Sequence, residues 1–285
     1  MLPRGPVLVL GCPRSGTTAL AYPLFQRNCL FTNELNVFGA YAMEPEKREE
    51  WICEYVWALY RQELAAEKLD ELAEMVKGKE FREQIEATYE FLSKISSIVD
   101  LRKYTLRDRS PAERTEVIQP LKQGEDNKLW GDKHPTLVLD DNLPDIVKTW
   151  PTDARVIYVQ RDGRDVIASL LRLEWIKPEE IGKYFDRWAK CYYSIKKLSR
   201  VLFVRQETLL TNPASVVKSM NRFLRCDAVT VEDYQMYIYK HSRYDEHMVT
   251  GLGEKRKHQG YWKDYFNPGV IPSEAKVVLQ ELGYA

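Results

Sequence analysis

A loop rich in glycine and hydroxyl residues follows the first apolar run of the chain. Residues 7–10 are Val-Leu-Val-Leu, which predicts a buried strand, and residues 11–18 are Gly-Cys-Pro-Arg-Ser-Gly-Thr-Thr. The loop matches the phosphate-binding pattern G-x-x-x-x-G-K-[ST], except that Thr17 stands where a nucleoside triphosphatase has lysine. Backbone N–H groups at a helix start attract an anion, and Arg14 adds a permanent charge with a planar fork. The loop therefore predicts a site for one terminal phosphate and its attached group, against the alternative of an ordinary glycine-rich turn.

A second candidate anion site follows another apolar run. Residues 155–159 predict a buried strand, which leads into the polar run Gln-Arg-Asp-Gly-Arg-Asp at residues 160–165. Ser169 stands eight residues after Arg161, about two turns into the helix expected next. Both side chains can face one phosphate only if that helix runs back along the crevice. A solvated turn has the same composition, so the residues alone leave both interpretations open.

These two stretches must be positioned by a sheet. Apolar runs at residues 7–10, 155–159 and 201–204 predict three short buried strands, residues 29–31 predict a further strand, and helical spacing separates them. This alternation is typical of an α/β fold, a P-loop-like doubly wound parallel sheet flanked by helices. Ligands of such sheets bind at the carboxyl ends of the strands, and the three apolar runs each lead into polar, charged sequence at that end.

A helical insertion is expected between the sheet strands, over about residues 44–126. Apolar residues recur at three-and-four spacing between residues 46 and 99, which predicts two or three amphipathic helices. Residues 44–91 carry 14 acidic and 7 basic side chains. This excess is typical of a solvated helix face, and the alternative is a lid over an acceptor site that prefers a neutral or cationic substrate. Residues 102–126 are polar and predict a loop.

The composition excludes several classes of protein. The 285 residues contain no linker rich in Ser, Gly or Pro, so residues 1–285 are expected to form one domain. Lysine plus arginine equals aspartate plus glutamate, 42 each, which argues against nucleic acid or an anionic membrane as the main partner. No signal peptide and no 18-residue apolar run is visible, so a soluble, cytoplasmic protein is expected. Reduced thiols and no metal site are expected from five scattered cysteines: Cys12, Cys29, Cys53, Cys191 and Cys226.

The loop CPRSGTT and the stretch VIYVQRDGRDVIAS together resemble the sulfotransferase family that uses 3′-phosphoadenosine 5′-phosphosulfate (PAPS). The resemblance implies that the first motif binds the 5′-phosphosulfate, and that an arginine and a serine in the second bind the 3′-phosphate. Many members have lysine at the position of Arg14, and arginine keeps the charge. The residues that carry over as nucleotide-binding are Arg14, Ser15, Gly16, Thr17 and Thr18 from the first motif, and Arg161 and Ser169 from the second.

Two later stretches agree with this resemblance. Residues 204–213, which include a glutamate, a leucine and a proline, are similar to the family's segment after its next strand. Residues 256–263, RKHQGYWK, resemble the C-terminal Arg-Lys-Gly region that closes over the 3′-phosphate and adenine. This likeness implies that Arg256 and Lys257 bind the nucleotide. Two residues separate Lys257 from Gly260, so which basic side chain reaches the phosphate stays open.

The resemblance implies an in-line transfer of a sulfuryl group from PAPS, as a co-substrate without metal, to a hydroxyl or amine of a small molecule. Positioning and charge stabilisation supply most of the acceleration in such transfers. Arg14 and Lys133 are the candidate cations at the bridging oxygen of the donor, although Lys133 could also be an exposed loop lysine. We favour His134 as the general base, since an imidazole titrates near neutrality, with Glu34 orienting the acceptor or sharing the proton. The sequence alone does not rank His134 and Glu34 firmly; comparing the activities of His134→Ala and Glu34→Ala would.

Two other functions compete with this interpretation. A small-molecule kinase would need Mg²⁺ and the lysine that the loop lacks. A non-catalytic nucleotide-binding protein would bind the bisphosphate without transferring sulfate. The partners expected are a small-molecule acceptor, as in secondary metabolism, with no nucleic acid and no membrane, whereas the acceptor's identity and a homodimer stay open.

Overall fold

The computed structural model describes most of the segments that the motifs occupy. The described residues are 7–26, 30–33, 44–60, 66–80, 83, 84, 86–88, 90, 91, 130–149, 154–226, 229–232, 234 and 260–284. They divide into two compact units, each of which is described by itself. The first unit draws on Met1–Leu8, Leu24–His134 and Asp145–Arg155, and the second on Val9–Pro23, Pro135–Pro144 and Val156–Ala285.

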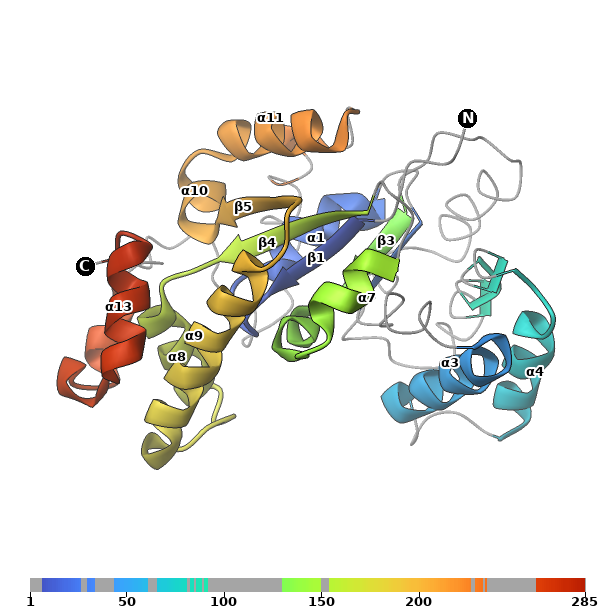
Figure 1. Ribbon diagram of the computed structural model, residues 1–285, viewed down its shortest axis with the longest axis horizontal. Coiled ribbons are helices and arrows are strands. Elements are labelled where there is room, and N and C mark those ends of the chain that lie inside the picture. Colours follow the sequence, from blue (N-terminus) through green and yellow to red (C-terminus); the bar gives the residue numbers. More distant parts are fainter. Residues whose placement is uncertain are drawn as a thin grey trace. The chain divides into compact units, whose positions relative to one another are not determined.

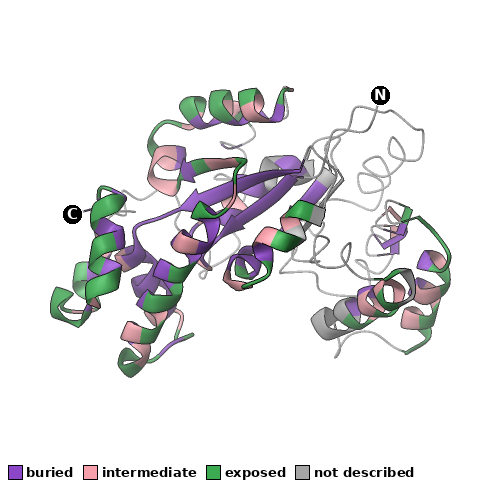
Figure 2. Cartoon of the chain, viewed as in Figure 1, coloured by how far each residue is buried: buried purple, intermediate pink, exposed green. Residues whose placement is uncertain are grey.

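A parallel sheet with helices around it organises the chain, as the sequence predicts. Its strands follow the order β2-β3-β1-β4-β5, with bounds β1 (Val7–Gly11), β2 (Leu30–Asn33), β3 (Trp130–Lys133), β4 (Arg155–Gln160) and β5 (Val201–Arg205). The pairs β2 with β3 and β4 with β5 run parallel. Every residue of β1 and β4 is buried, because these β-branched and leucine runs have protein on both faces (Figure 2).

One expectation about strands needs correction, and one strand was not predicted. The run at 201–204 forms β5, but this strand is mostly half-exposed and the Phe203 side chain is 44% exposed. The reason is its place at the end of the strand order, where only one edge is paired. The strand β3 was missed altogether, because Trp-Gly-Asp-Lys contains no apolar run.

The second unit surrounds β4 and β5 with helices (Figure 1). The bounds are α1 (Thr17–Gln26), η2 (Pro135–Leu139), α8 (Gly163–Arg172), η3 (Pro178–Glu180), α9 (Ile181–Lys196), α10 (Gln206–Thr211), α11 (Pro213–Leu224), η4 (Tyr261–Asp264), η5 (Pro268–Val270) and α13 (Ser273–Glu281). Helix α9 packs against α8, α13 and the short helix η2, whereas α10 and α11 pack together beside β5. Helices such as α9 and α13 bury one side and expose the other (Figure 2).

The first unit contains helices of the predicted insertion. Helices α3 (Pro45–Tyr60) and α4 (Ala66–Val76) pack against each other, and α4 buries Leu72 and Val76 on one side. The amphipathic helices expected here are therefore confirmed, and α7 (Leu143–Thr149) follows later in the chain. The expected loop at 102–126 lies outside the described residues. Within the described segments, no helix has the length and apolar character needed to cross a membrane.

Candidate functional site

The loop between β1 and α1 makes a tight turn that requires both of its glycines. A Cβ on Gly11 would lie 2.8 Å from the Val159 carbonyl oxygen and 2.7 Å from the Thr17 side chain. Gly16 has a φ of +88°, a left-handed conformation that glycine adopts without strain. The amide of Ser15 donates to the Cys12 carbonyl at 2.9 Å, which closes the turn. The sequence pattern of the loop thus corresponds to a compact turn at the end of a buried strand.

Arg14 is strained within this loop. Its φ is 73°, and a left-handed conformation costs a residue with a Cβ about 1–2 kcal/mol. Its guanidinium lies 5.3 Å from the ring centre of Trp175, which is 60% exposed. Strain of this kind concentrates at functional sites, where the surrounding structure holds it.

The second motif meets the loop at Arg14. The Nε of Arg14 donates to Ser169 Oγ at 3.1 Å, and Arg161 donates from a terminal guanidinium nitrogen to the Arg14 carbonyl at 2.8 Å. Arg161 and Ser169 are both buried. Among the described residues no atom accepts a hydrogen bond from Arg161 Nε, although this nitrogen is buried. Residues separated by about half of the chain therefore form one cationic cluster, which we call the arginine cluster: Arg14, Arg161 and Ser169.

The turn from β4 into α8 places Ser169. Asp162 caps the helix by accepting from the Arg164 amide at 2.9 Å, and Trp188 Nε1 donates to the Arg161 carbonyl at 3.3 Å. A Cβ on Gly163 would lie only 2.6 to 2.8 Å from the Trp188 ring, so glycine is required for this close approach. Helix α8 then carries Ser169 about two turns along, as the sequence predicts.

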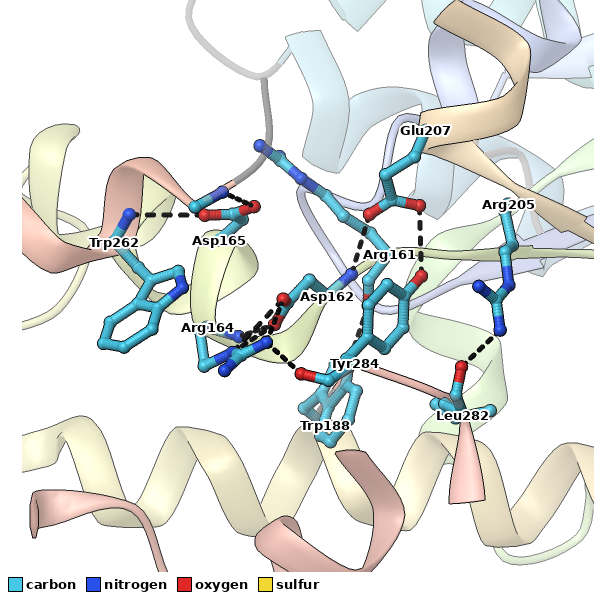
Figure 3. Close-up of polar contacts among 11 residues, drawn as sticks. Arg161, Asp162, Arg164, Asp165, Trp188, Arg205, Glu207, Trp262, Leu282 and Tyr284 are labelled. Atoms are coloured by element: carbon cyan, nitrogen blue, oxygen red, sulfur yellow. Dashed lines mark hydrogen bonds and ion pairs between the residues drawn. The ribbon is translucent and has the colours of Figure 1, made fainter. Parts of the chain in front are cut away.

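Glu207, in the first turn of α10 directly after β5, holds the same turn in place. Its carboxylate accepts from the Asp162 amide at 3.1 Å and from the Tyr284 hydroxyl at 3.0 Å (Figure 3). Arg164 pairs with Asp162 at 2.7 Å and donates to the Tyr284 carbonyl. The glutamate lies in the stretch 204–213 noted in the sequence, whereas nothing in the sequence around Tyr284 indicated a role.

Asp165 fixes the segment that follows the basic run near the C-terminus. Its wholly buried carboxylate accepts from the Gly260 amide at 2.9 Å and from the Trp262 amide at 3.3 Å (Figure 3). Burial raises the pKa of Asp165 to about 6, although the Gly260 N–H and the Arg161 charge act in the opposite direction. Between these two amides, Tyr261 donates its hydroxyl to the Asp165 carbonyl at 2.6 Å.

Two further predicted site residues belong to the other unit. Lys133 ends β3 and is 2% exposed, so the alternative of an exposed loop lysine is wrong. His134 follows it, with Nδ1 3.9 Å from a carboxylate oxygen of Asp132, which is itself fully buried. The remaining predicted site residues, Glu34, Arg256 and Lys257, lie outside the described residues.

Comparison with known proteins bears on this arrangement. The family model described as "Sulfotransferase family" matches residues 6–230. The solved sulfotransferase domain of the Synechococcus PCC 7002 olefin synthase is 18% identical, with a TM-score of 0.61 over 100% of this chain and 96% of that one. The sulfotransferase domain from the curacin biosynthetic pathway is also 18% identical, with a TM-score of 0.56 over 100% and 99%. No curated protein sequence matches the chain. At these identities the solved structures establish the fold.

Proposed function

The chain belongs to the sulfotransferase family, and on that premise we propose that it transfers the sulfuryl group of PAPS to a hydroxyl or amine of a small-molecule acceptor. The observation that carries the proposal is the arginine cluster. It joins the phosphate-type loop, which lacks the lysine of a triphosphatase, to a second cationic group at the end of a neighbouring strand. A nucleotide phosphorylated at both ends of its ribose needs two cationic groups of this kind.

The residues of the cluster fit such a nucleotide. The buried Nε of Arg161 gains an acceptor when a phosphate oxygen binds, and an unsatisfied buried donor is costly. We assign the 3′-phosphate to Arg161 and Ser169, with Arg256 and Lys257 as further partners. The 5′-phosphosulfate is assigned to the loop residues Arg14, Ser15, Gly16, Thr17 and Thr18.

The proposed chemistry needs two kinds of group. The bond from sulfur to the donor's bridging oxygen breaks as the bond to the acceptor atom forms, and negative charge grows on the bridging oxygen. Arg14 and Lys133 are assigned to offset that charge. His134 is assigned to take the acceptor's proton, and Glu34 to orient the acceptor or share the proton.

Nucleotide titration tests the donor. By calorimetry, we expect adenosine 3′,5′-bisphosphate (PAP) to bind and ATP with Mg²⁺ to bind far more weakly, because the loop has no lysine for the β- and γ-phosphates. Arg161→Ala is expected to lose at least about tenfold in PAP affinity, which is the size of a lost hydrogen bond to a charged group. Arg187→Ala removes an exposed arginine of α9 and serves as the control. Preference for ATP would indicate a kinase instead.

The transfer itself is tested with labelled donor. We expect incubation with PAPS and a metabolite extract to give sulfated products that mass spectrometry detects. Tight PAP binding with no sulfated product from any extract would favour a non-catalytic nucleotide-binding protein.

A further inference from the structure

The hydroxyl of Tyr261 lies at the pair of residues to which we assign the 3′-phosphate. It is 3.5 Å from a terminal nitrogen of Arg161, and the Tyr261 ring centre is 5.6 Å from the Arg161 guanidinium carbon. Ser169 belongs to the same cluster, since its Oγ accepts a hydrogen bond from Arg14 Nε at 3.1 Å. Tyr261 therefore contacts Arg161 of the second motif, although the sequence drew attention only to the basic residues before it.

The backbone on both sides of Tyr261 is held in place. The amides of Gly260 and Trp262 both donate to the Asp165 carboxylate, at 2.9 and 3.3 Å. The Trp262 ring is buried and lies 4.9 Å from the Arg164 guanidinium. These contacts fix the backbone of Tyr261, and its hydroxyl is held by its hydrogen bond to the Asp165 carbonyl. A side chain that is already held in this way reduces the entropy cost of binding a ligand.

The hydroxyl is a donor that can change its acceptor. Burial raises the pKa of Tyr261, so the phenol keeps its proton at neutral pH. It now donates to the Asp165 carbonyl, which lies in the first turn of α8 and also serves as a helical acceptor. A phosphate oxygen is the stronger acceptor, because hydrogen bonds to a charged group exceed those to a neutral carbonyl.

We propose that Tyr261 is a nucleotide-binding residue whose hydroxyl donates to the phosphate held by Arg161 and Ser169. This inference rests on the proposed function, because it requires a 3′-phosphorylated nucleotide at the arginine cluster. It assigns a further, uncharged donor to that phosphate. Tyr261 thereby adds to the preference for a nucleotide with a 3′-phosphate over one without it.

The test compares two nucleotides on one conservative variant. Tyr261→Phe keeps the ring and removes the hydroxyl. We expect its affinity for PAP to fall about tenfold, and its affinity for adenosine 5′-phosphate, which lacks the 3′-phosphate, to stay unchanged. Tyr265→Phe is the matched control, because Tyr265 is a neighbouring tyrosine that is 39% exposed, with its ring 5.8 Å from that of Tyr261. Both affinities of that control are expected to match the wild type.

Three results would overturn the inference. If Tyr261→Phe bound PAP as tightly as the wild type, or more tightly, the hydroxyl would not bind the phosphate. It would then only donate to the Asp165 carbonyl. An equal loss for both nucleotides would mean that the hydroxyl acts through the structure of the loop. In both cases the proposed function stands as long as the wild type binds PAP. The third result is a wild type that does not bind PAP, which would overturn the inference and the proposed function together.

A second pair of variants guards against poor folding of Tyr261→Phe. Tyr261→Gln keeps a side-chain donor and Tyr261→Leu has none. Tighter PAP binding by the glutamine variant supports the inference, and equal binding by the two contradicts it.

Discussion

At the scale of single residues, the site depends on side chains whose backbone or burial is unfavourable in isolation. Arg14 has a left-handed backbone, Arg161 has a buried nitrogen without an acceptor in the described part of the chain, and Asp165 is a buried carboxylate. Specific contacts offset the costs at Arg14 and Asp165, whereas the cost at Arg161 is expected to be offset when a phosphate binds. Two of them lead to predictions about stability that can be measured without knowing the acceptor.

The strain at Arg14 predicts different outcomes for two truncations. Arg14→Gly and Arg14→Ala both lose the guanidinium, but only alanine retains the penalty of a positive φ. We therefore expect the glycine variant to be more stable than the alanine variant by about 1 kcal/mol in urea unfolding. Both should lose about 10²-fold or more of any sulfuryl transfer, because a charge at the reacting group is gone. Equal stability of the two variants would show that the backbone strain is absent.

The buried Asp165 predicts a pH dependence of stability. Its pKa of about 6 lies above the value near ~3.9 of an unfolded aspartate, so the native state binds the proton more tightly. The free energy of unfolding therefore falls, through this group, as pH rises from about 4 to about 6. Asp162 acts to raise this pKa, and Arg161 acts to lower it.

Urea unfolding from pH 4.5 to 7 checks this sign. The wild type should lose stability relative to Asp165→Asn as the pH rises, because asparagine does not titrate. A difference that stays flat, or that grows in the opposite direction, would contradict the raised pKa.

Sequence reasoning at the residue scale found part of the site. Arg14, Arg161 and Ser169 were predicted because their motifs have recognisable spacing, and the structure brings them into contact. Asp165 stands in the same polar run, yet its partners lie 95 and 97 residues away, and no local pattern specifies such a pairing. Tyr261 was missed for the same reason.

At the scale of elements, the turn between β4 and α8 orients Ser169 toward Arg14 in the loop between β1 and α1. Its geometry depends on the contact between Gly163 and the Trp188 ring. Strands with continuous apolar runs, β1 and β4, could be predicted from sequence, because burial on both faces selects such residues. The short polar β3 could not, since pairing with neighbours rather than its own composition makes it a strand.

Gly163→Ala tests the importance of this turn. The added methyl would overlap the Trp188 ring, so we expect destabilisation of about 1–3 kcal/mol and weaker binding of PAP, since α8 must shift. Gly182→Ala in α9 is the control, because nothing lies within 4 Å of its added Cβ. A helical glycine replaced in open space should gain about 0.5–1 kcal/mol. Unchanged stability and PAP affinity in Gly163→Ala would contradict the proposed role of the turn.

At the scale of the whole molecule, residues near position 284 connect the end of the described chain to the site. Tyr284 contacts Glu207 and Arg164, and Arg205 donates to the Leu282 carbonyl (Figure 3). The fold class could be predicted because each strand or helix is specified by residues that are close together in the sequence. The contacts of Tyr284 and Arg205 join residues far apart in the sequence, so they could not be predicted. A single domain over residues 1–285, and a lid formed by residues 44–126, stay predictions.

Tyr284→Phe measures the contribution of this connection. Burial raises the pKa of Tyr284, so its hydroxyl stays protonated and donates to Glu207. Removing it should destabilise the protein by about 1 kcal/mol in urea unfolding. PAP affinity should change less than in Arg161→Ala, because Tyr284 acts through Glu207 and Asp162. A larger loss of PAP affinity than in Arg161→Ala would place Tyr284 in the nucleotide site itself.

A crystal structure of the protein with bound PAP tests the central claim most directly. We predict oxygens of the 3′-phosphate within about 2.7–3.2 Å of both the Arg161 guanidinium and Ser169 Oγ, and the 5′-phosphate at the loop beside Arg14. A complex in which neither Arg14 nor Arg161 reaches a phosphate, even through one bridging water, would contradict the account.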